Sequence, residues 1–139
     1  MYNKYKRVTL SPDQIQMFAD IIGQDEVTQK IFLFIGTKMA HLEEIENSSN
    51  RIGATIKDMS IEIQINRKVK GKSKYKVVKA PLDRKRAERI VQQLLMTGLI
   101  YFELVGITKV LFLTDRGIVV LKELVQRGDI FSSIETSEE

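Results

Sequence analysis

The chain has 139 residues, of which 43% are hydrophobic and 29% charged, and a net charge of +4; this balance is expected for one water-soluble domain with its own core. It contains no cysteine, which excludes disulfides, thiolate nucleophiles and cysteine-ligated zinc. No apolar run approaches the roughly 18 residues of a membrane span, and the first residues lack the apolar stretch of a signal peptide, so we expect a cytoplasmic protein without membrane contacts.

Two helices are predicted in the first third of the chain. Residues 11–14 read SPDQ, the pattern of a helix start, and an apolar stripe runs from there to Gly23. Asp25 opens a longer helix that reaches about Glu46 and is apolar enough to be central to the core. Residues 47–50 are polar and are expected to form a loop.

The middle of the chain is ambiguous. Residues 54–64 have apolar side chains at helical spacing, whereas residues 60–65 alternate as a strand does. Residues 66–80 read NRKVKGKSKYKVVKA, which is compatible with a long basic loop or with a small hairpin about Gly71. Both alternatives stay open on the sequence of this segment alone.

A helix over residues 83–97 is the strongest prediction. Asp83 can cap its first turn through a side-chain oxygen. Its apolar residues recur at three- and four-residue spacing, which leaves arginine, lysine and glutamine on the opposite face. Gly98 ends the helix, because glycine readily adopts the left-handed conformation found there.

Two short strands and a final helix follow. Residues 99–104 and 109–113 are β-prone and hinge at Gly106. Either Thr114 or Asp115 caps the last helix, which covers residues 115–127.

This order of helix, glycine, two-stranded wing and capped helix resembles the winged helix-turn-helix of the MarR-like regulators. The resemblance covers about a third of the chain. The residues that carry it are Leu94, Gly98, Leu99, Ile100, Leu113, Thr114, Gly117 and Leu121.

The resemblance implies a mainly α fold with a small β-hairpin wing, an α+β winged helix-turn-helix. We expect a single winged-helix domain over residues 1–128, with an N-terminal helical extension and a flexible acidic tail at residues 129–139. A winged helix needs a short helix before its recognition helix, so residues 54–64 are assigned as helical. Residues 66–80 depart from the pattern, since they are about a dozen residues longer than a tight helix-turn-helix connection.

The positive charge is concentrated in one part of the chain. Residues 65–89 contain eleven lysines and arginines against only Asp83 and Glu88, so the remaining residues are net acidic. A basic block on an acidic body favours a polyanion bound on one face. The alternative interpretation is a solvated loop rich in lysine, but the block runs directly into the predicted recognition helix.

Double-stranded DNA is the predicted partner. Arginine can bind guanine, and glutamine adenine, through two hydrogen bonds in the major groove, whereas lysine suits phosphate as a mobile point charge. Arg86 is expected nearer the core boundary, where it would reach a phosphate, and an ordinary charged surface helix is the alternative for this element. The predicted contacts are Arg84, Lys85, Arg86, Arg89, Gln92 and Gln93 on the helix, Arg67, Lys68, Lys70, Lys72, Lys74, Lys76 and Lys79 in the basic segment, and Thr108 and Lys109 in the wing.

No residue pattern indicates catalysis, and we expect neither an enzyme nor a cofactor or metal site. His41 is the only histidine and sits within the apolar second helix, where a structural role is favoured. The carboxylates show no spacing typical of a catalytic pair, and the glycines form neither a phosphate loop nor a dinucleotide fingerprint.

A homodimer is expected, because one recognition helix rarely supplies a long DNA site and because the resemblance implies dimerisation through terminal helices. The predicted interface residues are Ile15, Phe18 and Ile22 on the first helix, and Val119, Val120 and Leu124 on the last. The alternative is that these apolar faces close the core of a single chain.

The predicted function is that of a dimeric transcriptional regulator, most simply a repressor that occupies its operator. A first alternative is a TubR-like partition adaptor, which would coat centromere repeats of a plasmid or phage and bind a filament-forming protein. A second is a winged-helix protein-interaction module, which the apolar residues Val105 and Ile107 of the wing would suit. RNA binding would require that Tyr75 and the basic segment prefer single strands.

Overall fold

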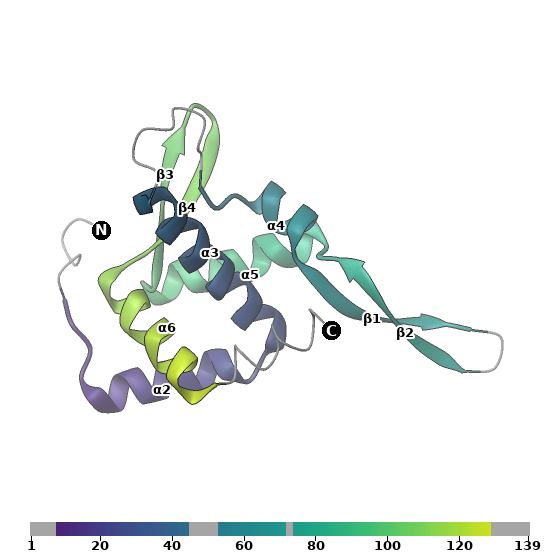
Figure 1. Cartoon of the computed structure of the whole chain (residues 1–139), viewed down its shortest axis with the longest axis horizontal. Coiled ribbons are helices and arrows are strands. Elements are labelled where there is room, and N and C mark those ends of the chain that lie inside the picture. The colour runs from purple at the N-terminus through teal and green to yellow at the C-terminus, as the bar shows by residue number, and fades with distance from the viewer. Residues whose placement is uncertain (1–7, 45–52, 72–73, 129–139) are drawn as a thin grey trace.

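The computed structural model describes residues 8–44, 53–71 and 74–128, which form an α+β structure of five helices and two antiparallel hairpins (Figure 1). In chain order the elements are α2 (Pro12–Gly23), α3 (Glu26–Glu44), α4 (Ile56–Glu62), β1 (Gln64–Lys70), β2 (Tyr75–Pro81), α5 (Arg84–Thr97), β3 (Ile100–Val105), β4 (Thr108–Leu113) and α6 (Asp115–Arg127). The predicted α+β class is confirmed at this level. Across these described residues, each helix is too short or too polar to cross a bilayer.

The first two helices begin where their caps predict. The Ser11 hydroxyl accepts a hydrogen bond from the Gln14 amide at 3.2 Å, and the Gln14 side chain accepts one from the Ser11 amide at 2.8 Å. This reciprocal pair satisfies two amides that a helix start leaves without partners. Asp25 accepts a bond from the Thr28 amide at 3.2 Å and so opens α3. The predicted end of this helix near Glu46 and the loop at residues 47–50 lie outside the described residues.

Helix α3 supplies the centre of the core, as its apolar width predicts. Ile31, Phe32 and Ile35 are fully buried, and the helix contacts α2, α5, α6 and β4. Gly36 permits the close approach of α6, because a Cβ at this position would lie 2.5 Å from Leu121 Cδ2. All five helices contribute side chains to one buried cluster.

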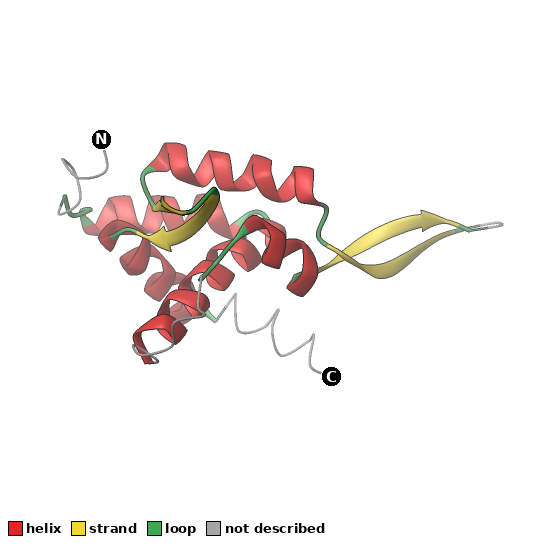
Figure 2. Cartoon of the chain, turned by 90° about the horizontal axis from the view of Figure 1, so that it is seen from above, coloured by secondary structure: helices red, strands yellow, loops and turns green. Residues whose placement is uncertain are grey.

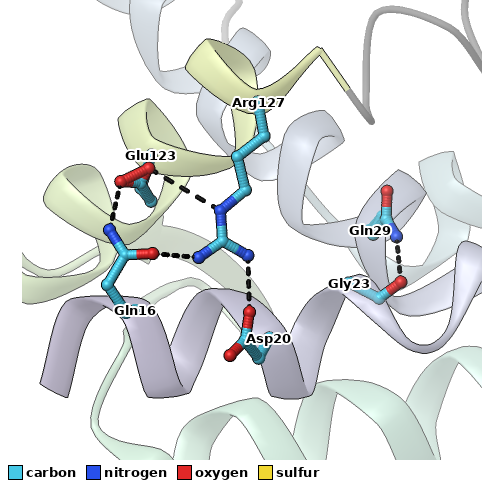
Figure 3. A network of polar contacts seen from close by, with 6 residues as sticks. All are labelled: Gln16, Asp20, Gly23, Gln29, Glu123 and Arg127. Atoms are coloured by element: carbon cyan, nitrogen blue, oxygen red, sulfur yellow. Dashed lines mark hydrogen bonds and ion pairs between the residues drawn. The ribbon is translucent and has the colours of Figure 1, made fainter. Parts of the chain in front are cut away.

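A polar network joins α2 to α6 on the surface of the molecule (Figure 3). The Arg127 guanidinium lies 2.7 Å from Asp20 Oδ1 and 3.7 Å from Glu123 Oε2, and it also donates to Gln16. Gln16 in turn donates to Glu123 at 2.5 Å. Partly exposed pairs of this kind contribute little individually, so the helix pair depends mainly on the apolar residues that it buries.

Those apolar residues correct the predicted dimer interface. Ile22, Val120 and Leu124 are 3%, 0% and 0% exposed within a single chain, where α2 packs on α6. The prediction is therefore wrong for these three residues, since an amphipathic face already buried in its own core has no surface left for a second subunit. Ile15 and Phe18 are half-buried, and Phe18 packs against the core.

The hairpin predicted as the wing is present. Strands β3 and β4 pair from Ile100 opposite Leu113 to Val105 opposite Thr108, with a turn at Gly106, which has a φ of +63°. Residue Ala54 forms an isolated bridge to Leu111, whose amide donates to the Ala54 carbonyl at 2.8 Å. This bridge holds the chain just before α4 against the base of the wing.

The ambiguous middle segment contains both a helix and a strand. Helix α4 is confirmed but shorter than residues 54–64, because Thr55 is its N-cap and Ile63 is already extended. Strand character therefore prevails from residue 64, which corrects the predicted C-terminal boundary. Of the two alternatives for residues 66–80, the structure has the hairpin, and it projects well away from the body of the molecule (Figure 2).

The start of α6 is held tightly against the base of β3. Thr114, rather than Asp115, is the N-cap, and its hydroxyl accepts from the Gly117 amide at 3.1 Å while lying 3.0 Å from the Leu99 carbonyl oxygen, to which it donates. A Cβ on Gly117 would overlap that carbonyl oxygen and lie 3.1 Å from the Leu99 carbonyl carbon. Only glycine therefore fits at position 117.

Substitution Gly117→Ala is expected to lower the free energy of unfolding by about 1–3 kcal/mol, the usual cost of overpacking. The clash is with backbone, which cannot rotate away as a side chain can. Urea unfolding followed by circular dichroism measures the difference.

Gly23→Ala is the matched control, because its Cβ would lie 3.8 Å from Leu124 Cδ2, an ordinary van der Waals contact. It is expected to leave stability unchanged or to raise it slightly. Equal stability of the two variants would contradict the close packing of α6 on Leu99.

Candidate nucleic-acid interface

Helix α5 is fixed at both ends by the residues that predict it. Asp83 Oδ2 accepts from the Arg86 amide at 3.2 Å, and Gly98 adopts a left-handed conformation with a φ of +77°. The inward positions Ala87, Ile90, Val91 and Leu94 are all at most 3% exposed. This burial fixes the rotation of the helix about its axis, which the sequence alone leaves open.

The outward face of α5 carries the residue types that bind base edges. At 100° per residue, Lys85, Arg89, Gln92 and Met96 form the ridge opposite the core, and all four are exposed. Gln93 is also exposed and lies beside this ridge. The α5 ridge, as we call these first four residues, thus combines two cations and an amide with one apolar side chain.

Arg86 lies apart from the ridge. It is half-buried at the edge of the α5 packing face, in agreement with its predicted place near the core boundary.

A groove of about 750 Å³ runs between the first turn of α4, helix α5 and the wing. It brings together four predicted contact residues from two elements, Arg84 and Gln92 on α5 and Thr108 and Lys109 on the wing. Lys57 of α4 also lines the groove and was not predicted. In the sequence, Lys57 is simply a cation in the first turn of a short helix, and its place in the groove could not be predicted without the position of the β3–β4 hairpin.

Two acidic residues, Asp58 and Glu88, line the same groove. Glu88 forms an ion pair with Arg84, with Arg84 Nε 3.4 Å from Glu88 Oε1, and the two side chains are 65% and 53% exposed. Exposed pairs one helical turn apart are weak because water and salt screen them. The pair therefore leaves the Arg84 guanidinium available to a stronger anion.

The hairpin β1–β2 carries the second set of predicted contacts. Its described cations are all exposed, and none of them lines the groove. These residues are Arg67, Lys68, Lys70, Lys74, Lys76 and Lys79, while Lys72 lies outside the described residues. The structure thus separates the predicted contacts into two regions, the α5–wing groove and the projecting hairpin.

The base of the hairpin is tied to the core, so its position relative to α5 is defined. Ile63, Ile65 and Leu82 are buried, and the Leu82 amide donates to the Ile63 carbonyl at 2.9 Å. From α3, Lys30 Nζ donates to the Gln64 carbonyl at 3.0 Å. These contacts hold both ends of the hairpin between α4 and α5.

The wing tip is mostly apolar. Ile107 is 99% exposed, and Leu104 and Val105 are 62% and 53% exposed. Lys109 Nζ lies 4.7 Å from the centroid of the Phe102 ring, a cation–π distance. Lys109 is the only basic residue among residues 105–109 of the tip.

Over the residues that the structure describes, no three histidine, aspartate or glutamate side chains gather as metal ligands would. The side chain of His41 lies outside this description.

Comparisons with known proteins assign no family. No protein-family model, curated protein or solved structure matches the chain. The functional inference therefore rests on the α5 ridge, the groove and the hairpin.

A double-mutant cycle tests whether Arg84 is available. With Arg84→Ala, Glu88→Ala and the double variant, we expect a coupling free energy of at most about 0.5 kcal/mol in urea unfolding, as for other exposed pairs on one helix. A coupling above about 1.5 kcal/mol would mean that Glu88 sequesters Arg84.

Proposed function

We propose that the chain is a winged helix-turn-helix protein that binds double-stranded DNA with α5 in the major groove, and that it acts as a dimeric transcriptional regulator, most simply a repressor. The observation that carries the proposal is the exposed ridge of Lys85, Arg89, Gln92 and Met96 on a helix whose opposite face is buried. Binding needs no catalysis and no cofactor.

The order of elements supports the winged-helix assignment. Helix α3 is followed by the bridge at Ala54, then by α4, α5 and the β3–β4 hairpin. The bridge holds Ala54 beside β4, and the start of α4 and the β3–β4 hairpin line opposite sides of the groove. The departure from the MarR-like pattern is the hairpin at residues 64–81, which replaces the tight turn between α4 and α5.

The dimensions and charges of this surface suit a duplex. A major groove about 12 Å wide admits one α-helix, in which Arg89 can bind guanine and Gln92 adenine through paired hydrogen bonds. Lys57 and Lys109 line the groove beside α5, where they would contact the phosphates that border the major groove. Met96 can contact a thymine methyl group.

Two copies would read two half-sites about one helical turn apart. The proposed contact between them uses the apolar side chains that α2 and α6 leave exposed, rather than the buried ones. These residues are Met17, Ile21 and Val119, which are 49%, 55% and 42% exposed.

A second function is favoured by the apolar wing tip, which an interaction with protein would cover. Ile107 is almost fully exposed at a position where a wing that enters the minor groove would carry a cation. A partition adaptor combines DNA binding with such a protein contact, since it hands DNA to a filament-forming partner. Gel shifts with isolated and tandem sites separate the two roles, because cooperative spreading over repeats belongs to the adaptor and independent occupancy of single sites to the repressor.

Selection from a randomised duplex pool tests base reading by α5. The wild-type chain is expected to enrich a defined sequence, and Arg89→Ala to weaken binding to it by about 1–3 kcal/mol, or roughly 5- to 150-fold, with relaxed preference at one guanine. Fluorescence anisotropy with the enriched duplex measures the affinity.

Lys122→Ala is the matched control, because it removes one exposed cation from α6, away from α5 and the hairpin. Its affinity should stay within about twofold of wild type. If the Arg84→Ala/Arg89→Ala variant keeps full affinity at low salt, the protein-interaction function is the correct one.

A further inference from the structure

The hairpin β1–β2 is a large exposed element that the reading of bases by α5 leaves unexplained. Apart from Gly71, every residue between positions 66 and 79 whose exposure is described is exposed. Both views show the hairpin extending past the body rather than lying on it (Figures 1 and 2). Beyond its base, the ribbon thus exposes its side chains to a partner outside the described chain.

Its cations lie on both faces. The register pairs Arg67 with Val78 on one face, and Lys76 lies two residues from Val78 on that same face. On the other face Lys68 pairs with Val77, and Lys79 pairs with Asn66. Residues 63–82 include no acidic residue, so the charged side chains on both faces are all cations.

Apolar side chains are interleaved with these charges. Tyr75, Val77 and Val78 are 71%, 62% and 41% exposed, on the part of the ribbon beyond its buried base. A partner that presents only point charges would leave these residues in water. A partner with both phosphates and apolar base edges would cover them.

We propose that the hairpin is a rigid arm that lies in the major groove of the duplex bound by α5, beyond the base pairs that α5 contacts. This inference rests on the proposed function and adds a second binding element to it. Cations on opposite faces require anions on opposite sides, and the two phosphate strands that border a groove supply them. A major groove about 12 Å wide admits a two-stranded ribbon, whereas a minor groove about 6 Å wide is too narrow.

The length and the attachment of the arm suit this placement. Seven residues per strand extend roughly 20 Å. Only two residues lie between the end of the arm at Pro81 and the start of α5 at Arg84, and the base of the arm is fixed by buried Ile65 and Leu82. Arm and helix are therefore joined through the core and would contact neighbouring stretches of one groove. In this position the cations of each face contact the phosphates of the wall that this face meets.

Two matched double variants test the two faces. Arg67→Ala/Lys76→Ala removes two exposed cations from one face, and Lys68→Ala/Lys79→Ala removes two from the other. Each is expected to make the negative slope of log affinity against log salt shallower by about 1.8. At 0.15 M salt, the affinity of each for a 30-base-pair duplex is expected to fall roughly thirtyfold. Circular dichroism confirms that each variant is folded, and Lys122→Ala remains the single-charge control.

The outcomes separate this inference from the proposed function. Reduced duplex affinity in both double variants supports insertion of the arm into the groove. Reduced affinity in only one of them means that the ribbon lies along a single phosphate strand, which overturns the inference. If both double variants keep wild-type duplex affinity while Arg89→Ala binds more weakly, the hairpin does not bind DNA, and α5 alone contacts the bases. If only affinity for single-stranded RNA or DNA falls, the arm binds single strands and the inference is wrong.

Chemical interference identifies the groove. Methylation of guanine N7, which faces the major groove, should block the wild-type chain at positions beyond those lost in Arg89→Ala, and both double variants should lose this additional interference. Competition by a minor-groove ligand at those positions, without N7 interference, would place the arm in the minor groove and contradict the proposal.

Discussion

The fold depends on how the chain closes the two ends of the β1–β2 hairpin. The Leu82 amide bonds to the Ile63 carbonyl at 2.9 Å, and Gln64 pairs with Pro81, so the chain leaves α4 and returns to α5 at nearly the same point. The buried side chains of Ile63 and Leu82 fix that point in the core. Helices α4 and α5 therefore pack together, although a projecting ribbon separates them in sequence.

The distribution of charge follows from the same arrangement. On the body, several cations are neutralised locally: Arg127 lies beside Asp20 and Glu123, and Lys38 lies 3.2 Å from Glu62. The hairpin has no acidic residue, so its field is not cancelled close by. Positive potential thus extends outward from one end of the molecule, where it would raise the rate of encounter with a polyanion at low salt.

Local chemistry allowed much of the fold to be predicted. Asp83, Thr114 and Gly98 mark element ends through their own side chains or backbone freedom, so the bounds of α5 and α6 follow from them. The end of α4 did not, because residues 60–65 fit both periodicities and the pairing of residue 64 with Pro81 is a distant contact.

The candidate site was predictable only in part. The sequence identifies α5 as the basic helix, but only packing shows which residues form its ridge and that Lys57 lies across the groove. The apolar faces of α2 and α6 fitted either a core or a dimer interface, because an amphipathic pattern does not show what covers its apolar side.

The hairpin adds a constraint on solubility, since a two-stranded ribbon has an unpaired backbone edge on each side, and edges of this kind template aggregation. Repulsion between the lysines of separate molecules keeps such edges apart. Acetylation or neutralisation of these side chains would therefore leave a ribbon whose exposed valines and unpaired edges promote aggregation.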